Sequence, residues 1–119
     1  MIGAGAIGTY LLDKIREEEN LEVTSILVRD EEKYKHLEDK YNVKLYTEFE
    51  SFMQSDMDIV VEAANVETAK QYLSKILVDK NAVIISIGAL ADESYIQEIN
   101  ETLAQSGREL YLPSGAIGG

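Results

Sequence analysis

The chain has 119 residues, enough for one modest domain, and its 45% hydrophobic and 28% charged content is typical of a folded domain rather than a disordered segment. A net charge of −11 disfavours nucleic acid and anionic membranes as partners, and the absence of cysteine excludes disulfides and thiolate sites. No apolar run approaches the roughly 18 residues of a membrane span and no signal peptide is recognisable, so we expect a cytoplasmic protein.

The chain opens with GAGAIG at residues 3–8, between a short strand fragment and a predicted helix over residues 9–19. This spacing matches G-x-G-x-x-G, the dinucleotide-binding fingerprint. In that interpretation Gly3 makes the tight turn, Gly5 lets the backbone approach the pyrophosphate, and Gly8 lets the helix pack closely on the strand. The helix N-terminus then supplies an anion site that the acidic chain otherwise lacks. The alternative is a plain tight turn.

Strand-like and helix-like segments then alternate. Apolar, β-branched runs typical of buried parallel strands are ILVR (26–29), DIVVEA (58–63), AVIISIGA (82–89) and LYLP (110–113). Helical spacing predicts helices over residues 30–42, 66–80 and 92–107, the last capped by Asp92 and ended by Gly107.

This alternation predicts a doubly wound α/β fold, a parallel sheet with helices on both faces in three layers, α/β/α. We expect the central strand to end at Gly3 and to be flanked by strands that contain Ile26, Val60 and Ile85. The whole chain, residues 1–119, would then form one dinucleotide-binding domain.

The second strand runs out into Arg29 and Asp30, where the fingerprint expects an acidic residue for the ribose 2′-hydroxyl. An arginine there can bind a 2′-phosphate, whereas an aspartate repels it. The order therefore favours NADP and leaves NAD open. The alternative is that Arg29 is solvated and paired with Glu31 or Glu32.

Three later segments fall at the carboxyl ends of predicted strands, where ligands of open α/β sheets bind. They are EAANVE (62–67), SIGALAD (86–92) and LPSGAIGG (112–119). Their small residues suit a flat ring that lies close to the backbone. Ordinary strand–helix turns are also small and polar, so each segment alone decides little.

In order and spacing, GAGAIG, VVEAAN, SIGAL and PSGAIGG resemble the amino-terminal NAD(P)-binding domain of the L-aspartate dehydrogenase family, of the homoserine-dehydrogenase-like Rossmann group. The resemblance covers nearly the whole chain and implies oxidation of L-aspartate to iminoaspartate, for NAD biosynthesis or for release of oxaloacetate and ammonia. It implies that the pyrophosphate contacts Gly3, Gly5, Ala6, Ile7 and Gly8. It places Ala116 on the nicotinamide side and makes Ser114, in the same loop, a cofactor-binding residue. It places Ala63, Ala64, Asn65, Gly88 and Ala89 along the cleft between the two ends.

Two features depart from the family. Only Met1 and Ile2 precede Gly3, and the chain stops at Gly119 where the family continues into a domain with its catalytic histidine and dimer interface. The one histidine, His36, lies in a charged helical segment, and we expect it on the surface. Lys14, Lys70 and Tyr72 lie on predicted helices, and no motif in the sequence assigns them to a site.

We therefore expect the cofactor half of an enzyme, with no catalytic or metal-binding residue of its own and no turnover when alone. Its partners would be L-aspartate, bound through the absent domain, and a second copy in a full-length homodimer. The alternatives are a stand-alone NAD(P)-sensing module and the cofactor domain of another amino-acid or sugar dehydrogenase.

Overall fold

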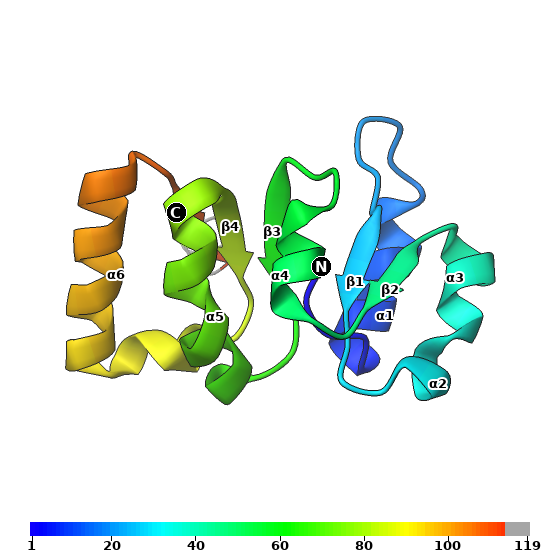
Figure 1. The fold of residues 1–119 in the computed structure, drawn as a ribbon, viewed down its shortest axis with the longest axis horizontal. Coiled ribbons are helices and arrows are strands. Elements are labelled where there is room, and N and C mark those ends of the chain that lie inside the picture. The colour runs from blue at the N-terminus through cyan, green and yellow to red at the C-terminus, as the bar shows by residue number, and fades with distance from the viewer. Residues whose placement is uncertain (114–119) are drawn as a thin grey trace. The chain divides into compact units, whose positions relative to one another are not determined.

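A computed structural model describes residues 1–113 of the chain (Figure 1). The chain consists of two compact units, Met1–Met57 and Asp58–Gly119. In the described part, every pairing between strands is parallel. The parallel α/β architecture predicted from the sequence is therefore confirmed within each unit.

The first unit begins with a short extended segment that pairs with a buried strand. The Leu27 N–H donates to the Met1 carbonyl and the Gly3 N–H donates to the Leu27 carbonyl, each at 2.9 Å. Leu27 ends β1 (Ser25–Leu27), which also pairs with β2 (Lys44–Tyr46). Ile2 forms an isolated parallel bridge with Leu27. Whether this segment also adjoins the strand that contains Val60 stays a prediction.

Four helices belong to the first unit: α1 (Ala6–Ile15), α2 (Glu31–Tyr34), α3 (His36–Tyr41) and α4 (Phe49–Gln54). The single helix expected over residues 30–42 is wrong, because it breaks at Lys35 into α2 and α3. There the Glu38 N–H donates to the Lys35 carbonyl at 3.1 Å, a spacing of three residues instead of four. The hydrophobic core of the first unit includes the buried residues Leu12, Ile26, Leu37, Leu45 and Phe52.

The second unit contains a three-stranded parallel sheet in the order β3 (Ile59–Glu62), β4 (Asn81–Ile84), β5 (Leu110–Tyr111). Helix α5 (Val66–Asp79) links β3 to β4, and a short 3-10 helix, η1 (Ile87–Ala91), leads into α6 (Glu93–Ser106). The strand expected to contain Ile85 ends one residue earlier.

Helices α5 and α6 pack against each other, side by side in Figure 1. The buried hydroxyl of Tyr95 donates to the Ala69 carbonyl at 2.9 Å. Burial raises the pKa of Tyr95 to about 12, so this hydroxyl stays protonated and remains a donor. The contact fixes the register between the two helices.

Both predicted ends of α6 are confirmed. The Asp92 carboxylate accepts hydrogen bonds from the Ser94 N–H at 3.0 Å and the Tyr95 N–H at 3.2 Å. Gly107, with φ of 72°, takes the left-handed conformation that glycine adopts without strain. The Lys70 ammonium also lies 2.8 Å from Asp92, so one carboxylate joins α5 to the start of α6.

This arrangement predicts an acid-sensitive link between the two helices. The hydrogen bond from Lys70 and those from the helix N–H groups lower the pKa of Asp92 below its ordinary value of 3.8. The ionised Asp92 therefore stabilises the fold at a pH above 3.8. This stabilisation is lost as the pH falls through the lower pKa of the folded state. Asp92→Asn keeps a helix-capping side chain without the charge. When the pH is lowered from about 6 to about 3, the melting temperature of the wild type should fall further than that of Asp92→Asn. Equal falls in the two melting temperatures would refute this link.

Candidate functional site

The glycine loop at residues 3–8 has a different structural reason for each glycine. Gly3 has a φ of 94°, which favours glycine at the turn out of the strand. A Cβ on Gly8 would lie 2.8 Å from the Gly3 carbonyl oxygen, so this position requires glycine for close packing of α1 on the loop. A Cβ on Gly5 would meet no atom of residues 1–113 within 4 Å. The roles predicted for Gly3 and Gly8 in turn and packing agree with this geometry, and the space at Gly5 is open to a ligand.

The N-terminus of α1 is available to an anion. Gly5 is the N-cap, no side chain from the described residues caps the helix, and the first turn contains no acidic residue. The first N–H groups of any helix lack acceptors within the helix, and the helix dipole is positive there. Gly5, Ala6 and Ile7 are exposed, with Ile7 53% accessible. This end of α1 therefore offers N–H donors to a phosphate without competition from a carboxylate in its first turn.

Arg29 and Asp30 leave the sheet at the same edge as the glycine loop, because Gly3 pairs with the end of β1. Both side chains are exposed. The Asp30 carboxylate caps α2 by accepting the Lys33 N–H at 3.1 Å. In residues 1–113 Arg29 forms no ion pair, whereas Glu31 lies 3.9 Å from Lys35. The proposed pairing of Arg29 with Glu31 or Glu32 is thus absent from this part of the chain.

In the second unit, the segments after β3 and β4 lie together at one edge of the sheet. Ala63 is buried and Ala64 is exposed, while the Asn65 side chain caps α5 by accepting the Thr68 N–H at 2.8 Å. Gly88 and Ala89 belong to η1, and a Cβ on Gly88 would lie 3.1 Å from the Val66 side chain. Their contact with a ligand stays a prediction, and Ser114 and Ala116 lie outside the described residues.

Sequence reasoning missed Glu62, which ends β3 as a buried carboxylate, 2% exposed. Its oxygens accept hydrogen bonds from Ala64, Ile85 and Ser86, in both strand-end segments of this unit. The available signal was a charged residue inside the apolar run DIVVEA, where a buried parallel strand normally carries only apolar side chains.

The other polar residues singled out in the sequence include His36, Lys14 and Lys70. His36 is exposed on α3, as expected, and Lys14 is exposed on α1, while Lys70 belongs to the pair with Asp92. Within residues 1–113 no group of three or more histidine, aspartate or glutamate side chains could hold a metal ion. In the same range no helix combines the length and the apolar character needed to cross a membrane.

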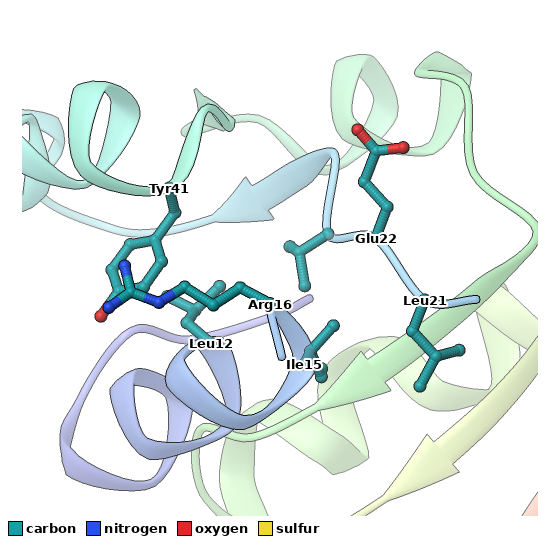
Figure 2. Close-up of a pocket in the computed structure, with 7 residues that line it drawn as sticks. Leu12, Ile15, Arg16, Leu21, Glu22 and Tyr41 are labelled. Carbon is teal, nitrogen blue, oxygen red and sulfur yellow. The ribbon is translucent and has the colours of Figure 1, made fainter. Parts of the chain in front are cut away.

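A cavity of about 210 Å³ lies in the first unit, near the C-terminal end of α1 (Figure 2). Arg16 lies across the Tyr41 ring, 5.1 Å from its centroid, and Leu12, Ile15, Leu21 and Val23 supply apolar lining. A ten-residue helix is about 15 Å long, so this cavity lies far from the glycine loop at the other end of α1. None of the residues predicted to contact the cofactor lines this cavity.

A strand, a glycine loop and a helix with an open N-terminus, followed by further parallel strands and helices, define a dinucleotide-binding domain of the Rossmann class. Residues 3–113 match the model of the family described as "Homoserine dehydrogenase, NAD binding domain", and the chain belongs to this family. The predicted Rossmann-type fold is thereby confirmed, and the domain is one that binds NAD(P).

Similarity to individual proteins extends over the whole chain. It is 33% identical to L-aspartate dehydrogenase of Methanocaldococcus jannaschii over 122 aligned residues, which cover 100% of this chain and 46% of that protein. Identity to the Archaeoglobus fulgidus L-aspartate dehydrogenase is 36%, covering 100% of this chain and 47% of the relative. The crystal structure of aspartate dehydrogenase from Thermotoga maritima matches 99% of this chain and 46% of its own, with 35% identity and a TM-score of 0.72. The chain thus spans about half the length of these relatives.

Proposed function

We propose that residues 1–119 are the cofactor domain of an NAD(P)-dependent oxidoreductase that oxidises L-aspartate. The observation that carries this proposal is the similarity to L-aspartate dehydrogenases over the full chain, at 33% and 36% identity. The open N-terminus of α1 beside Gly5 supports it physically, because it offers helix N–H groups and free space to a pyrophosphate.

When bound, NAD(P)⁺ accepts a hydride from the substrate carbon that bears the amino group, and the amino nitrogen loses a proton to give iminoaspartate. Water can then release oxaloacetate and ammonia from that imine. The proposed contacts of the pyrophosphate are Gly3, Gly5, Ala6, Ile7 and Gly8, and those of the adenosine ribose are Arg29 and Asp30. The proposed contact on the nicotinamide side is Ala116, with Ser114 in the same loop. The residues proposed to line the cleft between the pyrophosphate and nicotinamide ends are Ala63, Ala64, Asn65, Gly88 and Ala89. A cytoplasmic homodimer in the full-length enzyme, acting in NAD biosynthesis, belongs to the same proposal and rests on the family resemblance.

The test is an assay of the complete gene product for reduction of NAD⁺ and NADP⁺ with L-aspartate, D-aspartate, L-glutamate and L-homoserine. We expect reduction with L-aspartate and little with the other three substrates. A gene product that binds cofactor but prefers L-homoserine, or reduces cofactor with none of the four, would contradict the proposed substrate.

The 119-residue chain by itself is expected to bind cofactor without turnover. A general base must reach the proton that it removes, and the one histidine of this chain, His36, is exposed on α3. Purified chain is mixed with L-aspartate and either oxidised cofactor, and the absorbance of the reduced nicotinamide is followed. Sustained turnover would show that this chain carries a base of its own.

A further inference from the structure

Glu62 is a buried carboxylate for which the fold provides only neutral donors. It is 2% exposed at the end of β3, and it forms no ion pair with any residue in the described range 1–113. Burial of a charge costs free energy unless hydrogen bonds compensate for the lost water. Such a group therefore needs a full set of donors, and here the structure provides one.

The donors come from two different segments. Oε2 of Glu62 accepts the Ala64 N–H at 2.8 Å and the Ser86 hydroxyl at 2.7 Å. Oε1 accepts the Ser86 N–H at 2.8 Å and the Ile85 N–H at 3.2 Å. The Glu62 main-chain carbonyl also accepts the Ile85 N–H, at 3.1 Å. One side chain thus joins the segment after β3 to the segment after β4.

These contacts begin where the pairing between the two strands stops. The last pair in register is Glu62 with Ile84, so the residues beyond it have no further ladder to hold them together. Beyond the last strand pair, the Glu62 carboxylate connects the two segments by accepting hydrogen bonds from a main-chain N–H group of each. The same two segments contain residues proposed to line the cleft that leads to the nicotinamide end of the cofactor, such as Ala64 and Gly88.

We propose that Glu62 is a positioning residue that holds these two segments in the arrangement needed to bind the nicotinamide half of the cofactor. This inference rests on the proposed function of the domain. Replacement of Glu62 should therefore weaken the binding of the nicotinamide half of the cofactor and leave the binding of the adenosine half unchanged. A residue that served stability alone would weaken the binding of both halves equally when it is replaced.

Glu62→Gln is the informative substitution because it keeps the shape of the side chain. An amide has one acceptor oxygen and one donor nitrogen. If the oxygen faces Ile85 and Ser86, the nitrogen faces the Ala64 N–H, and two donors then oppose each other. The Ser86 hydroxyl can rotate to accept from the amide, so the main loss falls on Ala64. The variant should fold with this one segment displaced.

The experiment uses titration calorimetry on the 119-residue chain with two ligands. One is NADH or NADPH, whichever binds the wild type more tightly. The other is the matching fragment without nicotinamide, ADP-ribose or its 2′-phosphate. We expect Glu62→Gln to weaken binding of the complete cofactor about tenfold and that of the fragment less than twofold, a difference of about 1.4 kcal/mol.

Two controls separate this effect from charge and from stability. Glu101→Gln makes the same chemical change at an exposed position of α6, and it should leave both affinities unchanged. Ile99→Val removes a methylene from a buried position of α6, lowers stability, and should leave the ratio of the two affinities unchanged. Equal weakening of both ligands by Glu62→Gln, or no weakening, would overturn the role of Glu62. A wild-type chain that binds neither dinucleotide would instead overturn the proposed function, and this inference with it.

Discussion

Gly8→Ala is expected to lower both the stability of the domain and its affinity for cofactor. The new Cβ would lie 2.8 Å from the Gly3 carbonyl oxygen, a main-chain atom that cannot move aside without displacing the glycine loop. Overpacking of this kind costs about 1–3 kcal/mol. The displaced N–H groups at the start of α1 should weaken cofactor binding about tenfold or more, since a hydrogen bond to a charged group contributes roughly 1.5–3 kcal/mol. Denaturant unfolding and titration calorimetry measure the two effects.

Gly5→Ala is the matched control, because a Cβ at Gly5 meets no atom of the described chain, residues 1–113, within 4 Å and the residue has an ordinary φ of −73°. It should cost much less stability than Gly8→Ala and still weaken cofactor binding, since the methyl group occupies the space proposed for the pyrophosphate. If Gly8→Ala unfolds at the wild-type denaturant concentration, the packing argument is wrong. If Gly5→Ala binds cofactor as tightly as the wild type, the pyrophosphate does not approach the backbone there.

Arg29→Asp is expected to change the preference between the two cofactors. The exposed Arg29 guanidinium leaves the sheet beside the glycine loop and can donate to a 2′-phosphate. Charge-assisted bonds of roughly 1.5–3 kcal/mol give a preference for NADP of about ten- to a hundredfold, which the substitution removes. The affinity for NAD should stay the same or improve. The measurement is titration of both cofactors at one stated ionic strength, since salt screens exposed charges.

Asp30 opposes this preference if its carboxylate faces the same ribose, in which case the two cofactors bind comparably. In the structure, one carboxylate oxygen of Asp30 accepts a hydrogen bond from the Lys33 N–H at the start of α2. Arg108→Asp, at another exposed arginine, is the control for the change in net charge. If both affinities are the same in Arg29→Asp as in the wild type, the preference is set by other residues.

The accuracy of the sequence-based fold prediction depended on how much of each element is encoded locally. The ends of α6 were predicted correctly because Asp92 and Gly107 carry their own capping chemistry, whatever else surrounds them. Strand β2 and helix α4 were not predicted. β2 has three residues and α4 has six, too few to show a period, and packing in the first unit stabilises them. The break at Lys35 likewise has no glycine or proline to mark it.

The candidate site divides in the same way. The roles of Gly3 and Gly8 follow from backbone geometry that only glycine satisfies, so a sequence pattern could predict them. The apolar run DIVVEA signals the burial of Glu62, but its hydrogen bonds could not be predicted, since its donors lie up to 24 residues away along the chain. Only the parallel register of β3 and β4 brings the Ser86 N–H to that carboxylate.

The central claim is that the start of α1 binds the pyrophosphate of NAD(P). It is tested most directly by titrating isotope-labelled chain with NADH and NADPH and following the backbone amide resonances by NMR. We expect the amides of Ala6, Ile7 and Gly8 to shift together, with one dissociation constant, and pyrophosphate alone to shift the same amides more weakly. Saturating cofactor that leaves these three amides unchanged while other resonances move would contradict the account, because the dinucleotide would then bind elsewhere.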